Sequence, residues 1–122
     1  CTQDLAGKAG NFAPETSASM YANYFSSLSG GSELVYTIAA NYVSEFNSTG
    51  VADPAGDHDA STKIDLNVRL MMENGLEIKL FGKNVTDEIV GSSSLALPLT
   101  PGSFFKLWEP GKQFGISIRK SF

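Results

Sequence analysis

Cysteine, basic residues and long apolar runs are all scarce in this chain of 122 residues. Its one cysteine has no possible partner within the chain, and 9 basic residues against 13 acidic ones leave a formal net charge of -4. That balance provides no basic field for nucleic acid, so we expect no nucleic-acid partner. The length corresponds to one domain at most.

The longest uninterrupted apolar stretch runs only from Leu95 to Leu99. A transmembrane helix needs about 20 such residues, so a helical membrane span is excluded. Strands that cross a membrane as a β-barrel alternate apolar and polar residues and give a much weaker hydropathy signal, so this architecture stays open.

Cys1 opens the sequence, with no initiator Met and no signal peptide. We therefore expect a processed product or an excised piece of a longer protein. Three interpretations of Cys1 stay open: it forms a disulfide with a cysteine upstream, it carries the lipid of a bacterial lipoprotein, or it is an ordinary thiol.

The feature that the chain does contain is alternation. Apolar and polar residues alternate with a period of two, as along a strand that buries one face. The fold class is therefore all-β, an antiparallel up-and-down meander of about five strands. The strands are predicted over residues 19–27, 33–44, 62–72, 76–86 and 112–122. The last strand has Phe114, Ile116, Ile118 and Phe122 on one face, with Lys120 as the one break.

The turn around Gly75 decides the register of the middle strands. A two-residue loop would place the apolar faces of the two flanking strands on opposite sides of the sheet, which a single buried face does not allow. A three-residue loop over 73–75 instead pairs Leu70 with Ile78 and puts Gly75 at the left-handed position that such loops need. We predict the three-residue loop.

Short and long connections alternate along the chain. The loop at 28–32 is short and places Tyr24 opposite Tyr36, whereas 45–61 and 87–111 are long and rich in Gly, Pro and polar residues. In a meander, every second connection lies at the same end of the sheet. We therefore predict irregular long loops at one end and short turns at the other, which is the sidedness of outer-membrane barrels.

Four stretches together resemble the C-terminal end of a TonB-dependent outer-membrane receptor. Such chains carry an N-L-T-D-E-like stretch near the end of the penultimate strand, then a Pro-Gly-Arg-like turn and a last strand ending in Phe. The corresponding stretches here are LEIKLFGKNVTDE at 76–88, DLNVRL at 65–70, PGKQFGISIRKSF at 110–122 and DLAGKAGNFAPETSASMYANY at 4–24.

The resemblance implies a barrel of about 22 strands whose lumen is filled by an N-terminal plug. It implies energised uptake of a scarce nutrient, such as a ferric siderophore, across the outer membrane of a Gram-negative bacterium. Residues 1–122 would be the C-terminal segment of that barrel, in contact with outer-membrane lipid and with the rest of the barrel and plug. We identify no candidate for the plug or for the N-terminal box that contacts the TonB energising complex, so transport does not reside in these residues alone.

The resemblance also implies that the last strand is an assembly signal for the barrel-insertion machinery. Its usual form is a polar residue, a Gly two places on, alternating hydrophobics and a final aromatic. Lys120 departs from this pattern, because an apolar residue is common there. A cysteine pair that the family often carries before its D-L-S-G-K stretch would explain Cys1. The residues that fit the assembly signal are Gln113, Gly115, Ile118 and Phe122.

Few other residues suggest a catalytic, metal-binding or ligand-binding site. An acidic loop surrounds His58, but its spacing lacks the order of an EF-hand, and His58 has no Ser or Cys arranged for nucleophilic catalysis. We therefore expect no enzyme activity, no metal site and no cofactor. The acidic residues of that loop are Asp53, Asp57 and Asp59. Three aromatic residues are expected to form part of an aromatic girdle at the membrane interface, and not to contact a ligand. They are Phe104, Phe105 and Trp108. Residues expected to line the lumen are Lys63, Asp65, Asn67, Arg69, Lys79, Lys83 and Arg119.

The alternative is a small soluble or lipid-anchored β-sandwich that acts as a binding module, with Cys1 lipidated. Its apolar face would pack on a second sheet. Five strands that share one apolar face leave no second sheet to cover it, and the turn signals every 8–12 residues that an immunoglobulin-like sandwich shows are missing. We therefore favour the receptor segment, whose transported substrate cannot be inferred from these residues.

Overall fold

The computed structural model describes residues 6, 10, 12–49 and 53–122. Cys1 and most of residues 4–8 lie outside this part. The predictions made for Cys1 and for the start of the stretch at 4–24 therefore fall outside the described residues. The chain forms two compact units. The sheet unit comprises residues 18–42, 62–88 and 110–122, and the insert unit comprises residues 1–17, 43–61 and 89–109.

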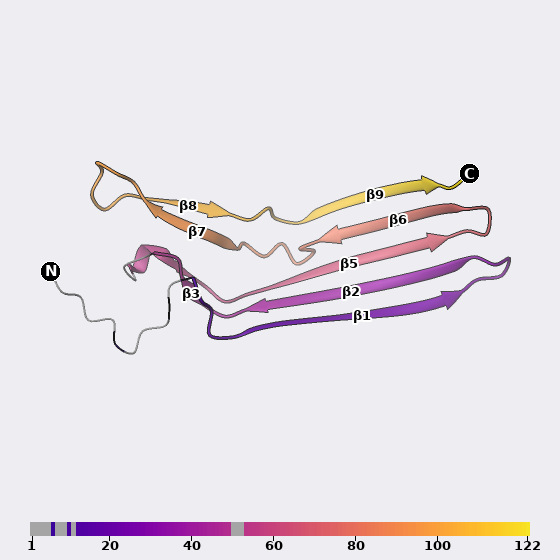
Figure 1. Cartoon of the computed structure of the whole chain (residues 1–122), viewed down its shortest axis with the longest axis horizontal. Helices are drawn as coiled ribbons and strands as arrows, with labels where there is room; N and C mark the ends of the chain where they lie inside the picture. Colours follow the sequence, from indigo (N-terminus) through magenta and orange to yellow (C-terminus); the bar gives the residue numbers. More distant parts are fainter. Residues whose placement is uncertain (1–5, 7–9, 11, 50–52) are drawn as a thin grey trace. The chain divides into compact units, whose positions relative to one another are not determined.

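The sheet unit is a five-stranded antiparallel sheet in the order β1-β2-β5-β6-β9 (Figure 1). Neighbouring strands in the sheet follow one another along the chain once the insert strands are set aside, so the predicted all-β meander is confirmed. No described strand pairs with the outer edge of β1 or β9, so the sheet is open. The strands are β1 (Ser17–Ser27), β2 (Glu33–Val43), β5 (Ser61–Met71), β6 (Leu76–Lys83) and β9 (Gln113–Lys120).

The hairpin between β5 and β6 has the predicted three-residue loop. Leu70 lies opposite Ile78, and the N–H of Met72 donates to the carbonyl of Leu76 over 2.8 Å. Gly75 adopts a φ of 79°, the left-handed conformation that a glycine reaches without strain. In the other hairpin, the rings of Tyr24 and Tyr36 lie 6.2 Å apart, as the predicted pairing requires.

The two faces of the sheet differ in chemistry, as the alternation predicts. Opposite pairs such as Leu80–Ile116 and Ile78–Ile118 place apolar residues of β6 and β9 on one side. The apolar face comprises Tyr24, Tyr36, Ile38, Leu66, Val68, Leu70, Ile78, Leu80, Phe114, Ile116 and Ile118. The polar face includes Thr37, Asp65, Asn67, Arg69, Lys79, Lys83, Ser117 and Arg119.

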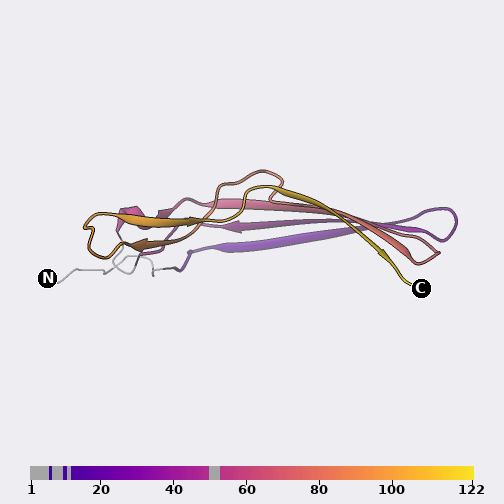
Figure 2. The same ribbon diagram turned by 90° about the horizontal axis from the view of Figure 1, so that it is seen from above.

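Almost nothing covers the apolar face. Seen from above in Figure 2, the strands of the sheet unit form a single twisted layer. Phe114 is 71% exposed and Ile116 is 63% exposed. Val35, on β2, is the one buried hydrophobic residue in the described part of the chain. The sheet therefore has an apolar surface but no core of its own.

Both long connections start and end at the same end of the sheet, because the direction of the strands alternates (Figure 1). The prediction that they are irregular is wrong. Residues 45–61 contain β3 (Phe46–Asn47), the 3-10 helix η1 (Pro54–Gly56) and β4 (Asp57–His58). Residues 87–111 contain a second hairpin, β7 (Gly91–Ala96) with β8 (Phe104–Trp108). Serine-rich β7 has weak strand propensity by itself, and pairing with aromatic β8 outweighs it.

β6 ends at Lys83, three residues before the predicted end, because Asn84 has a positive φ of 49° and starts a tight turn. The described residues form no helix with the length and apolar character needed to cross a bilayer.

Candidate functional site

The predicted assembly-signal residues lie along one strand rather than around a pocket. Gln113 begins β9 opposite Lys83, on the polar face. Ile118 lies opposite Ile78 on the apolar face, and Phe122 follows the strand, fully exposed. The departure at Lys120 has a local partner, because its ammonium lies 5.7 Å from the centre of the Phe122 ring.

Two glycines and two phenylalanines interlock at the pairing of β6 with β9. Gly115 lies opposite Phe81, and a Cβ on Gly115 would lie 2.3 Å from that ring. Gly82 lies opposite Phe114, and a Cβ there would lie 2.8 Å from the ring of Phe114. Each ring thus covers the backbone of the glycine across from it, one pair on each face of the sheet. Such cover compensates for the missing side chain of a strand glycine.

Asn84 organises the turn that follows β6. Its side chain is buried, donates to the carbonyl of Glu88 over 2.9 Å and accepts from the N–H of Glu88 over 2.9 Å. Its own N–H donates to Oδ1 of Asp65 on β5 over 2.8 Å. These bonds tie the N-V-T-D-E stretch to the start of β5 and give it one defined conformation.

Asp87 connects this turn to the start of β9. Its Oδ1 accepts from the N–H of Lys112 over 3.0 Å, and its Oδ2 lies 3.6 Å from the ammonium of Lys112. A Cβ on Gly111 would lie 2.9 Å from Oδ1 of Asp87, so a side chain there would displace this carboxylate. Two motifs that carry the family resemblance, Asn84–Glu88 and Pro110–Lys112, are thus in direct contact.

We expect Asp87→Asn to lower the heat stability of the folded protein at neutral pH and to matter less in acid. The N–H of Lys112, followed by its ammonium, lowers the pKa of Asp87 below its ordinary value of 3.8. A carboxyl with a lowered folded-state pKa stabilises the fold above its unfolded-state pKa, and this contribution is lost as the pH falls through the folded-state value. The midpoint of heat unfolding, measured from about pH 7 to about pH 2, tests this. A gap between wild type and variant that does not narrow in acid would contradict it, and Lys112→Gln is the control that keeps the backbone donor.

His58 is the centre of the insert unit. It is 5% exposed, its ring stacks on Phe46 with centroids 4.8 Å apart, and its Nε2 lies 2.7 Å from Oγ of Ser48. Oγ of Ser94 on β7 lies 3.4 Å from the same nitrogen. On the other side of the ring, a Cβ on Gly91 would lie 2.1 Å from Nδ1, so only glycine fits there. One imidazole therefore joins β3, β4 and β7.

The sequence did not predict that Ser48 and Ser94 lie beside His58. Ser48 is 1% exposed, however, and its hydroxyl also lies 3.4 Å from the carbonyl of Gly56, so no substrate can reach it in this arrangement. Burial, followed by the ammonium of Lys106, lowers the pKa of His58 below its ordinary 6.5 and outweighs the nearby carboxylates. The arrangement is that of a neutral histidine holding a fold together.

We expect the insert unit to loosen as the pH falls below about 6.5. A histidine with a lowered folded-state pKa binds its proton more readily when unfolded, so stability falls as the pH drops through the unfolded-state value. Hydrogen exchange at Ser48 and Ser94, compared between about pH 7.5 and about pH 5.5, is the measurement. His58→Gln should be less stable but should lose this pH dependence. Equal protection at both pH values in the wild type would refute the prediction.

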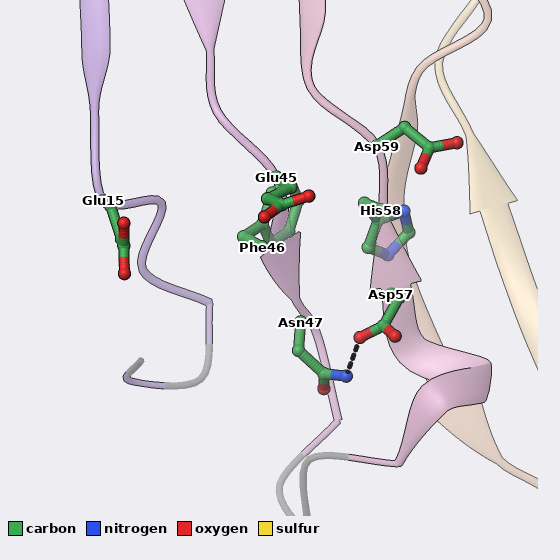
Figure 3. A pocket seen from close by; sticks show the side chains of 7 residues that line it. All are labelled: Glu15, Glu45, Phe46, Asn47, Asp57, His58 and Asp59. Carbon is green, nitrogen blue, oxygen red and sulfur yellow. Dashed lines mark hydrogen bonds between the residues drawn. The ribbon is translucent and has the colours of Figure 1, made fainter. Parts of the chain in front are cut away.

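A hollow of about 350 Å³ lies beside His58 in the insert unit (Figure 3). Asp57 points to Asn47, whose amide donates to it over 2.6 Å, whereas Asp59 points away from both (Figure 3). Asp53 caps η1 by accepting from the N–H of Ala55 over 2.8 Å. The described residues contain no cluster of three or more His, Cys, Asp or Glu side chains arranged to hold a metal ion. The hollow is lined by Glu15, Glu45, Phe46, Asn47, Asp57, His58 and Asp59.

The aromatic residues singled out in the sequence lie on β8. Phe105 and Trp108 are exposed and Phe104 is half-buried. The ammonium of Lys106 lies 5.8 Å from the centre of the Trp108 ring. An exposed Trp with an adjacent lysine is suited to a membrane interface, and that role stays a prediction.

Several structurally decisive residues give no signal in the sequence. Ser48, Ser94 and Gly91 belong to Ser- and Gly-rich stretches that read as loop, and only the fold brings them to His58. The interlock of Gly115 with Phe81 could have been found, because the predicted faces already place both on the polar side.

Comparisons of the chain with models of protein families, with curated proteins and with solved structures find no match.

Proposed function

We propose that this chain is the C-terminal part of the β-barrel of a TonB-dependent receptor in the outer membrane of a Gram-negative bacterium. The whole receptor would take up a scarce nutrient, such as a ferric siderophore, with energy supplied by the TonB complex. These residues would contribute barrel wall and extracellular loops, not catalysis.

The observation that carries the proposal is the exposed apolar face of a single-layered antiparallel meander. Phe114, Ile116 and Leu80 lie in one continuous apolar surface with no layer over it among the described residues. Water is an unfavourable environment for such a surface, because large exposed apolar patches are rare on soluble proteins. Lipid is a favourable one, and the polar face would then line the lumen, as in other barrels.

The free edges of the sheet support the same proposal. The outer edges of β1 and β9 carry backbone groups that no described strand satisfies. Such groups cannot be left unpaired in lipid, so a membrane sheet of this kind must be closed by further strands. A β-sandwich would instead need a second sheet against the apolar face, and the described residues supply one layer there.

The motif contacts add a third support. Asp87 and Lys112 belong to two stretches that were matched to the family separately, and they bond to each other across the start of β9. Because Lys83 pairs with Gln113, the end of β6 and the start of β9 lie side by side, and the two motifs occupy that place together. On this proposal, β9 presents Gln113, Gly115 and Ile118 to the barrel-insertion machinery.

The test is a gel of native outer membranes, probed with an antibody to residues 112–122, with and without boiling. We expect a band several times heavier than a chain of 122 residues that changes mobility on heating, since folded barrels resist detergent until heated. A soluble band at the size of this chain, with no change on heating, would overturn the proposal.

A further inference from the structure

One part of the insert unit, formed by β3, η1 and β4, has a hydrogen-bond network of its own. The side-chain amide of Asn47 donates to the carbonyl of Asp53 over 2.8 Å and to Oδ1 of Asp57 over 2.6 Å. The N–H of Ser48 donates to the carbonyl of Gly56 over 2.9 Å. None of these bonds involves β7 or β8. This β3–β4 part therefore does not need the β7–β8 hairpin to satisfy its polar groups.

The β7–β8 hairpin is attached to the β3–β4 part through β4. Among the described residues, two polar contacts join strands β7 and β8 to that part. Oγ of Ser94 lies 3.4 Å from Nε2 of His58, and the ammonium of Lys106 donates to the carbonyl of Asp57 over 3.2 Å. The backbone of Gly91 lies against the same imidazole, where no Cβ would fit. The attachment of the hairpin thus depends on two adjacent residues, one of which titrates near neutral pH.

The closed arrangement favours a neutral imidazole. Nε2 of His58 lies 2.7 Å from Oγ of Ser48 as well as near Ser94, and a neutral ring can accept a hydrogen bond from a hydroxyl there. An imidazolium cannot accept one. The ring is 5% exposed, and among the described residues it forms no ion pair with a carboxylate. A positive charge at this place is therefore costly while the hairpin covers it.

The charged groups around His58 do not compensate for that cost. Burial, followed by the ammonium of Lys106 on β8, lowers the pKa of His58 below its ordinary 6.5 and outweighs the carboxylates. Strand β7 contributes no charged side chain. When the hairpin moves away, the ring gains water and Lys106 leaves, so the open form binds the proton more tightly. The carboxylates nearby are Glu15 and Glu45 in the hollow, Asp53 at the start of η1, and Asp57 and Asp59 beside the ring.

We propose that the β7–β8 hairpin is an acid-sensitive switch: protonation of His58 releases the hairpin from β4, while β3, η1 and β4 keep their fold. Because a two-stranded hairpin is marginally stable in water, its amide hydrogens exchange once it is released. Acid loosening of the insert unit is thus concentrated in the hairpin. The release involves the insert unit alone, so it is independent of the receptor assignment.

Hydrogen exchange of the native, full-length protein, followed by mass spectrometry, compares the two parts. Rates for peptides from β7–β8 and from the β3–β4 part are corrected for the intrinsic effect of pH on exchange. Uptake of one proton at the ordinary pKa of 6.5 allows the open fraction to rise at most about tenfold between about pH 7.5 and about pH 5.5. We expect a several-fold rise in β7–β8 and a much smaller one in the β3–β4 part. Equal rises in both parts, or no rise in β7–β8, would overturn the proposal.

Two variants separate the switch from simple loss of contact. His58→Gln removes the titrating group, so exchange in β7–β8 should be the same at both pH values. Ser94→Ala removes one contact of the hairpin but no titrating group, so exchange in β7–β8 should be faster at both pH values with the ratio between them kept. A pH-dependent rise that persists in His58→Gln would assign the release to another group and overturn the proposal, as would loss of the ratio in Ser94→Ala.

Discussion

On the proposed function, Gly115→Val is expected to remove most of the heat-resistant folded protein from the outer membrane. A Cβ at this position would lie 2.3 Å from Cζ of Phe81 and within 3 Å of two further ring atoms, and valine adds two methyl groups beyond it. The Phe81 ring would have to leave the glycine that it covers. Overpacking of this kind costs about 1–3 kcal/mol. The measurement is the amount of protein in the folded, heat-shifted band.

Ser117→Val is the matched control, because Ser117 lies two residues further along β9, on the same face, opposite Lys79. Valine favours strands, so this variant should fold as well as the wild type. Removing the ring should partly rescue the first variant, so Phe81→Ala with Gly115→Val should fold better than Gly115→Val alone. Equal folding of Gly115→Val and Ser117→Val would show that the contact does not matter.

The alternation in the sequence was sufficient to predict the sheet. With a period of two, a slip of one residue would move a whole apolar face to the wrong side, so the pattern around Gly75 allowed only one loop length. The structure has that loop, with Leu70 opposite Ile78. Short turns join β1 to β2 and β5 to β6 directly, and the meander pattern extends the order across the two long connections.

The insert unit could not be predicted in the same way. β3 and β4 have two residues each, too short to show any period, and β7 reads Gly-Ser-Ser-Ser-Leu-Ala. Its centre depends on contacts between segments far apart in the chain, such as Ser94 with His58. Hydrogen bonds of this kind depend on the three-dimensional arrangement, so the local pattern of apolar and polar residues cannot predict them.

Ile116→Arg is expected to prevent stable assembly, because it places a charge in the middle of the apolar face. Ile116 lies opposite Leu80, between Phe114 and Ile118 along β9, and is 63% exposed in the isolated sheet. An arginine on the lipid side of a barrel costs about 2–4 kcal/mol near the bilayer midplane. The same change on a face in water would stay within about 0.5 kcal/mol. The folded, heat-shifted fraction in native membranes is the measurement.

The size of the effect reports what covers this face. Ile116→Met keeps the position apolar and should assemble normally, so any loss in Ile116→Arg is due to the charge. Arginine tolerated as well as methionine would mean that water covers the face, and the receptor proposal would then lose its main support. A strong loss in Ile116→Arg, together with tolerance of the charged variant Ser117→Glu on the other face, would fit an apolar environment on one side of the sheet and a hydrated one on the other. That asymmetry is what a barrel wall between lipid and lumen requires, because each strand must then satisfy both environments with alternate residues.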